Sequence, residues 1–78
     1  MELGTLKLGK DSRQPRWNAT EAETELLKAG FSLLRSKGSH RIYGMDELRV
    51  TVPFHPGVIL HPKVVKQVLA MIEEASSR

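Results

Sequence analysis

Apolar residues first recur at a helical spacing between residues 18 and 30. Ala22, Leu26 and Ala29 fall on one stripe, which indicates a helix that buries a single face. Gly30 follows the last of them, and glycine commonly takes the left-handed position that ends a helix. The pattern therefore predicts a first helix that stops at Gly30.

Two candidate capping boxes mark the beginning of this helix. Asn18 lies three residues before Glu21. Thr20 lies at the same interval before Glu23. The glutamates also suit the positive end of the helix dipole, so we predict a start near Asn18 or Thr20.

Three short β-type runs follow, at residues 31–35, 40–44 and 49–54. In the third run apolar and polar residues alternate, which indicates one buried and one solvated face. Residues 37–39 read as a turn or bulge and residues 45–48 as the second connection. Because the connections are short, the strands are expected to pair as an antiparallel meander.

A second helix is predicted from Pro62, since proline is well placed at the first helical position. Val65, Val68, Leu69 and Ile72 then recur at intervals of three and four residues. This spacing gives the helix one apolar stripe. Like the first helix, it needs a partner against which to bury that stripe.

The order of elements is thus α-β-β-β-α, an α+β fold with a three-stranded antiparallel sheet and two helices on one face. The other face of the sheet is expected to stay exposed. We assign residues 18–76 to this domain and residues 1–17 to an N-terminal extension, with a short edge strand possible around Leu6 and Leu8 and with Trp17 closing against the core. The predicted core is Leu26, Leu27, Phe31, Leu33, Ile42, Val50, Val52, Val65, Val68, Leu69 and Ile72.

Composition fits one small domain of 78 residues, with 40% hydrophobic and 27% charged residues, which argues against disorder. The absence of cysteine excludes disulfides and thiolate chemistry. No apolar run is long enough to span a membrane and no secretory signal is evident, so the expected compartment is the cytoplasm. The net charge is +3, and residues 31–70 hold six cations against two carboxylates. This basic middle is compatible with nucleic-acid binding.

His40 is the residue best placed to carry chemistry. It follows Lys37, Gly38 and Ser39 and opens a strand, and Arg41 comes directly after it. Glycine allows a ligand to approach the backbone closely, and an imidazole moves protons at neutral pH. Two flanking cations suit a phosphodiester, and the alternative is a strand-end histidine that is hydrogen-bonded locally.

The other two histidines, His55 and His61, each precede a proline. This position is typical of turn and cap residues. No two histidines share an element at the spacing of metal ligands, and no carboxylate stands beside them to orient a ring. We therefore predict neither a metal site nor a cofactor.

Lys63 and Lys66 lie in the first turns of the second helix, where cations oppose the helix dipole. Together with free N–H groups at this helix end, they would anchor a phosphate. The alternative is a solvent-facing pair without function. Tyr43 either stacks on a base from the open face or fills the sheet as an ordinary strand residue.

The chain resembles the HicA toxin family in the runs AGF at residues 29–31, KGSHRIY at 37–43 and VTVPFH at 50–55. The resemblance covers about residues 18–72. It departs from typical members in the 17 extra N-terminal residues and in a longer final helix.

The resemblance implies an α-β-β-β-α fold like the double-stranded-RNA-binding domain. It implies a metal-independent messenger-RNA endonuclease whose catalytic histidine is His40, held inactive by a HicB-type antitoxin. Lys37, Gly38, Ser39, Arg41, Lys63 and Lys66 are then the expected RNA-binding residues. A non-catalytic RNA-binding module and a pure protein-interaction domain are the alternatives.

Overall fold

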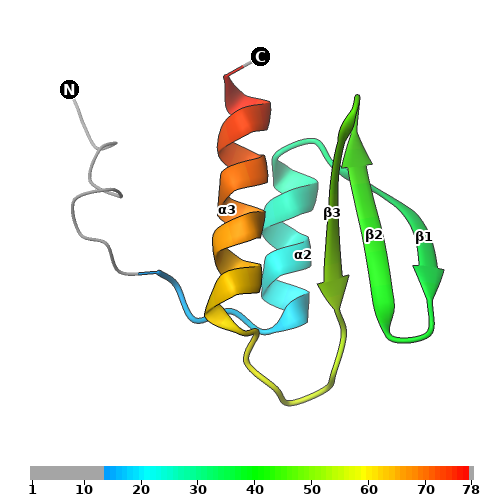
Figure 1. The fold of residues 1–78 in the computed structure, drawn as a ribbon, viewed down its shortest axis with the longest axis vertical. Helices are drawn as coiled ribbons and strands as arrows, with labels where there is room; N and C mark the ends of the chain where they lie inside the picture. The colour runs from blue at the N-terminus through cyan, green and yellow to red at the C-terminus, as the bar shows by residue number, and fades with distance from the viewer. Residues whose placement is uncertain (1–13, 78) are drawn as a thin grey trace.

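The computed structural model describes residues 14–77 and confirms the predicted α-β-β-β-α order. The elements are α2 (Ala19–Lys28), β1 (Ser32–Lys37), β2 (His40–Met45), β3 (Leu48–Pro53) and α3 (Pro62–Ser76) (Figure 1). The strand considered around Leu6 and Leu8 lies outside the described residues. Neither described helix has the length and hydrophobicity that crossing a membrane requires.

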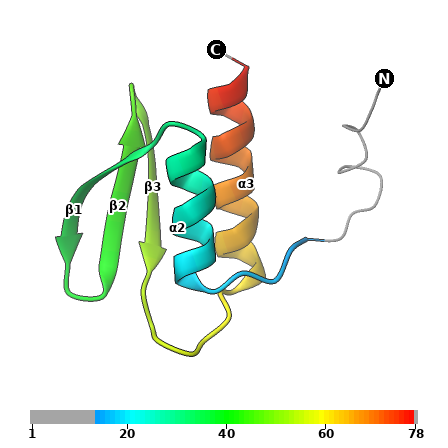
Figure 2. The ribbon, with the colours of Figure 1, turned by 180° about the vertical axis from the view of Figure 1, so that it is seen from behind.

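The three strands form an antiparallel sheet in the order β1-β2-β3, as predicted. Both helices lie on the same side of the sheet, and no element within residues 14–77 covers the other face (Figure 2). β1 extends to Lys37, two residues further than expected, so that Gly38 and Ser39 alone form the connection to β2.

Asn18, rather than Thr20, caps α2. The Asn18 side chain accepts a hydrogen bond from the Glu21 N–H, and the Glu21 carboxylate accepts one from the Asn18 N–H, both at 2.9 Å. These reciprocal bonds satisfy donors that have no partner inside the helix. Thr20 lies within the helix, where its carbonyl accepts a bond from the Thr24 hydroxyl.

Gly30 ends α2 as predicted, with a φ of +104°. The Gly30 N–H donates to the Leu27 carbonyl, and the Phe31 N–H donates to the Leu26 carbonyl. This pair of bonds is the Schellman arrangement. Leu26 and Phe31 are both buried, so the end of the helix is also closed by an apolar contact.

The core lies between the helices and the sheet, and its β2 member differs from the predicted one. Tyr43 is fully buried, whereas Ile42 is only partly covered. Tyr43 faces Val50 across β2 and β3, and both side chains point toward the helices. The assignment of Ile42 to the core was therefore wrong, because the next residue of β2, Tyr43, is the one that faces the helices. The buried set is Ala19, Ala22, Leu26, Phe31, Tyr43, Val50, Val52, Leu60, Val65, Val68 and Ala75.

Two further predicted core residues, Leu27 and Leu33, are 50% and 43% exposed. All six residues of β1 are exposed. β1 is the strand farthest from the helices (Figure 1), so the helices cover β2 and β3 and leave β1 as an overhanging edge. The sequence pattern around Leu27 and Leu33 does not show how far the helices extend over the sheet, so both residues were assigned to the core.

The segment before α2 packs beside the segment before α3. The Leu60 N–H donates to the Trp17 carbonyl at 2.8 Å, and Asn18 forms an isolated β-bridge with Ile59. Trp17 packs against the core, as the sequence predicted. These contacts bring the beginnings of both helices together at one end of the molecule.

Replacing Gly30 by alanine is expected to lower the free energy of unfolding by about 1–2 kcal/mol, because its backbone has a positive φ. A Cβ there would also lie 3.1 Å from the Met45 sulfur. Gly57→Ala is the matched control, since Gly57 has a φ of +74° but no neighbour within 4 Å. Urea unfolding should show the larger decrease at Gly30. Equal decreases would contradict the role of the Met45 contact.

Candidate active site

A two-residue turn of Gly38 and Ser39 joins β1 to β2. Gly38 has a φ of +60°, and a positive φ at only the first turn position is typical of a type II′ hairpin. A Cβ at Gly38 would meet no atom within 4 Å, so the backbone is open to a ligand here. The Phe54 N–H donates to the Ser39 carbonyl at 2.6 Å, which ties this turn to the end of β3.

His40 is the first residue of β2 and is exposed. It pairs with Lys37 on β1 and with Pro53 on β3. Directly opposed residues have Cβ atoms about 4.5–5.5 Å apart on the same face of a sheet. The structure therefore brings Lys37 and His40 together beside the open turn.

Arg41 does not accompany them, because successive strand residues point to opposite faces. Its guanidinium lies 3.3 Å from the Glu23 carboxylate of α2 and 4.0 Å from the centre of the Phe54 ring. The expectation that Lys37 and Arg41 both flank His40 is thus half correct. Lys37 lies beside the imidazole, and Arg41 is held on the helix side.

Tyr43 shares the helix side with Arg41. Its hydroxyl donates a 2.6 Å hydrogen bond to the Glu23 carboxylate. Burial, reinforced by that carboxylate, raises the pKa of Tyr43 above its ordinary value of 10. Because its ring is buried and faces the helices, the base-stacking interpretation of Tyr43 is wrong, and the interpretation as an ordinary strand residue is confirmed.

His61 is the N-cap of α3, in agreement with its interpretation as a cap. Its Nδ1 accepts the Lys63 N–H at 3.0 Å, and its carbonyl accepts the Val64 N–H at 2.9 Å. Pro62 has no N–H to offer. The backbone donors expected to be free for a phosphate at this helix end are therefore largely occupied.

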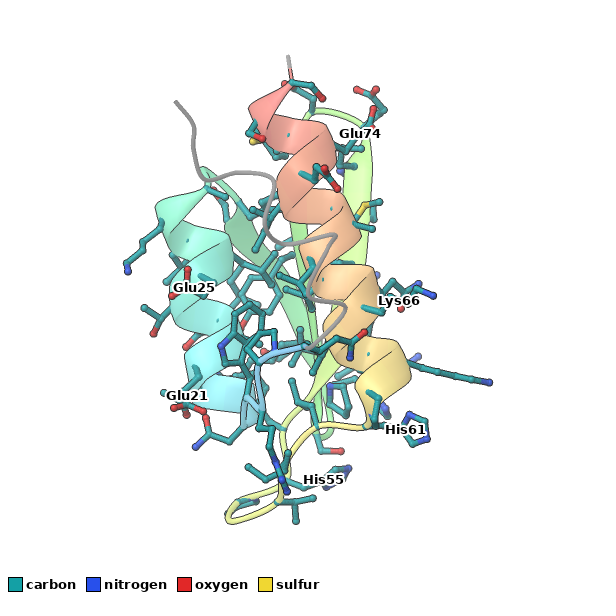
Figure 3. The ribbon with its side chains drawn as sticks, turned by 90° about the vertical axis from the view of Figure 1, so that its left-hand side faces the viewer. Glu21, Glu25, His55, His61, Lys66 and Glu74 are labelled. Atoms are coloured by element: carbon teal, nitrogen blue, oxygen red, sulfur yellow. The ribbon has the colours of Figure 1, made fainter. Side chains whose placement is uncertain are left out.

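His55 lies on the helix side of the sheet end and not with His40. It lines a hollow of about 320 Å³ between the start of α2 and the loop after β3, together with Arg41 and Phe54. Its carbonyl accepts the Val58 N–H at 3.2 Å, as expected of a turn residue. Figure 3 shows His55 in this loop, below the two helices.

Lys63 and Lys66 are exposed on the first turns of α3. Figure 3 shows Lys66 on the side of α3 that faces away from α2. Glu21 and Glu25 lie on α2. The β1–β2 turn and the beginning of α3 lie at the same end of the molecule (Figure 1). The two lysines therefore share an end of the fold with His40, although they belong to the other layer.

Two residues of this region were missed in the sequence. Glu23 was expected to favour the helix dipole or to form a capping box with Thr20. In the structure it contacts Arg41 and Tyr43, which are 18 and 20 residues away. Arg35 pairs with Ile42 and so lies on the same face as His40. The sequence could have indicated this, because Arg35 lies two residues before Lys37 and residues two apart on a strand share a face.

Among residues 14–77, no three histidine or carboxylate side chains gather in the manner of a metal site.

A family model described as "HicA toxin of bacterial toxin-antitoxin" matches residues 19–75. The matched segment runs from the first residue of α2 into the last turn of α3, and so contains all of the α-β-β-β-α unit except its last residue. No curated protein and no solved structure matches the chain.

Tyr43→Phe is expected to lower the free energy of unfolding by about 1–2 kcal/mol at neutral pH, since it removes the hydrogen bond to Glu23. Above pH 10 the unfolded wild type releases the phenol proton while the folded protein keeps it. Wild-type stability should therefore fall as the pH rises further, and the variant should lack this component. Urea unfolding between pH 8 and 11 measures both effects. Parallel pH profiles would contradict the assignment.

Proposed function

Since the chain belongs to the HicA family of toxins from bacterial toxin–antitoxin systems, we propose that it is a ribonuclease that cleaves messenger RNA in the cytoplasm and uses His40 as its general base. The observation that carries this proposal is the pairing of exposed His40 with Lys37 beside the open Gly38 turn. Cleavage of a phosphodiester needs a base that accepts a proton and a cation that stabilises the developing charge, and the imidazole and the ammonium group can supply these on one face.

The reaction follows from these groups. Neutral His40 accepts the proton of an RNA 2′-hydroxyl, whose oxygen attacks the adjacent phosphorus. The bond from phosphorus to the 5′-oxygen breaks, which gives a 2′,3′-cyclic phosphate and a 5′-hydroxyl. Lys37 stabilises the charge that develops on the phosphoryl oxygens. Because His55 lies on the helix side, water supplies the proton to the leaving oxygen. The hydroxide that remains takes the proton from His40, which restores the neutral imidazole.

RNA binding is assigned to the turn and to the end of the molecule around it. The open backbone at Gly38 and Ser39 approaches the phosphate closely, and Lys63 and Lys66 supply charge from α3. Arg41 is directed toward Glu23 in the free protein, so it contributes to the fold of this region before any RNA binds.

The antitoxin is proposed to be a HicB-type protein with an acidic surface. Such a surface would complement Lys37 and the lysines of α3, and it would mimic RNA phosphates. Antitoxin and RNA would then compete for the same face. The complex should form more slowly as salt rises, because the attraction is largely electrostatic.

A non-catalytic RNA-binding module is the second candidate, and one observation favours it. In the described part of the chain, the His40 ring makes no hydrogen bond to a carboxylate or carbonyl that would fix its tautomer. An oriented imidazole is the more effective base. Cleavage by the purified protein separates the two functions.

His40→Ala is expected to abolish RNA cleavage and relieve toxicity, since it removes the general base. The fold should be retained because His40 is exposed. His55→Ala is the matched control, an exposed histidine on the other side of the sheet end. A gel assay for the cyclic phosphate product, with circular dichroism, measures both. Undiminished cleavage by His40→Ala would overturn the assignment.

The double variant Lys63→Ala and Lys66→Ala is expected to weaken RNA binding alike for all sequences, because phosphate contacts carry no base information. The slope of log affinity against log salt should fall by ~0.7 for each phosphate of a single strand that is no longer neutralised. Stability should stay level or rise slightly, since two cations leave the positive end of α3. A decrease in stability with unchanged RNA affinity would show the pair to be structural.

A further inference from the structure

The open face of the sheet can be identified residue by residue from the contacts of β2. Arg41 and Tyr43 reach Glu23 on α2, so both point toward the helices. Alternation then places His40 and Ile42 on the open face. The register adds their β1 partners, since Lys37 pairs with His40 and Arg35 pairs with Ile42.

The charge on this face is of one sign. In the three strands, the only charged residues on the open side are Arg35, Lys37 and Arg49. Arg49 lies over Gly44 and donates to the carbonyls of Asp46 and Leu48, which leaves Arg35 and Lys37 nearer to His40. The carboxylates of residues 14–77 lie elsewhere, on the helices and in the β2–β3 turn.

Arg35 and Lys37 are both exposed, and neither forms an ion pair within residues 14–77. They lie two residues apart on one strand, a spacing of about 6.6 Å. The cation on the helix side of β2 differs, because Arg41 is neutralised by Glu23. Arg35 and Lys37, which form no ion pair within residues 14–77, therefore lie with His40, the proposed base, on the open face.

We propose that the RNA strand lies along the open face of the sheet, with the scissile phosphate at His40 and Lys37 and a neighbouring phosphate held by Arg35. This inference rests on the proposed function and assigns Arg35 a role in it. The described open face carries no aromatic side chain, so binding here is through phosphates and tolerates many sequences. Beyond His40 the RNA rounds the sheet end toward the lysines of α3.

The test is equilibrium binding of Arg35→Ala to a 2′-O-methylated single-stranded RNA, which lacks the attacking hydroxyl and stays intact. The dissociation constant should rise about three- to tenfold near 0.1 M salt, and the salt slope should fall by ~0.7. Lys28→Ala is the matched control. It removes the same charge from the end of α2, and it should change affinity less than about twofold with an unchanged slope.

Arg35→Lys should recover most of the affinity, because it restores the charge. In wild type, RNA should shift the amide resonances of Arg35 and Ile42 more than those at the C-terminal end of α2, a readout that does not depend on a variant.

If Arg35→Ala behaves like Lys28→Ala, the proposal is wrong. If it weakens only the complex with the antitoxin, the face belongs to a protein partner instead. Absence of any wild-type RNA binding would defeat the proposed function as well, whereas tight binding that ignores Arg35 removes this inference alone.

Discussion

The rest of the molecule depends on which side chains of β2 face the helices, and the Glu23 carboxylate fixes this choice. Glu23 accepts a hydrogen bond from Tyr43 and pairs with Arg41, two residues that alternate on one side of the strand. A slip of one residue would send every side chain of a strand to the opposite face. With Arg41 and Tyr43 fixed toward α2, His40 must face outward, and the register carries Lys37 and Arg35 with it.

The sequence predicted the parts of the fold that depend on neighbouring residues. The Asn18 cap, the Gly30 ending and the Pro62 start each follow from chemistry within a few positions. The phase of β2 depends on a contact between residues 20 apart, and adjacent Ile42 and Tyr43 are both apolar. Hydrophobic alternation cannot decide between such neighbours, so the sequence-based core contained the wrong one.

The candidate site divides in the same way. Lys37 and His40 flank a two-residue turn, so their proximity follows from the sequence. Arg41 was grouped with them by sequence proximity, although adjacent strand residues face apart. The catalytic role proposed for His40 came from the family resemblance, because the residues alone left open that it is an ordinary strand-end histidine. Glu23 and the limited coverage of β1 required the folded chain.

The overhanging β1 edge has a consequence for how the protein behaves in concentrated solution. Its backbone groups and the half-exposed Leu33 and Leu34 offer a template on which another chain can add as a strand. A register irregularity between Leu33 and Arg35 distorts this template, and Arg35 and Lys37 oppose stacking by charge repulsion. The same cations therefore act as gatekeepers against self-association. A chain without these two cations would lose this charge repulsion and would be expected to associate more readily through β1.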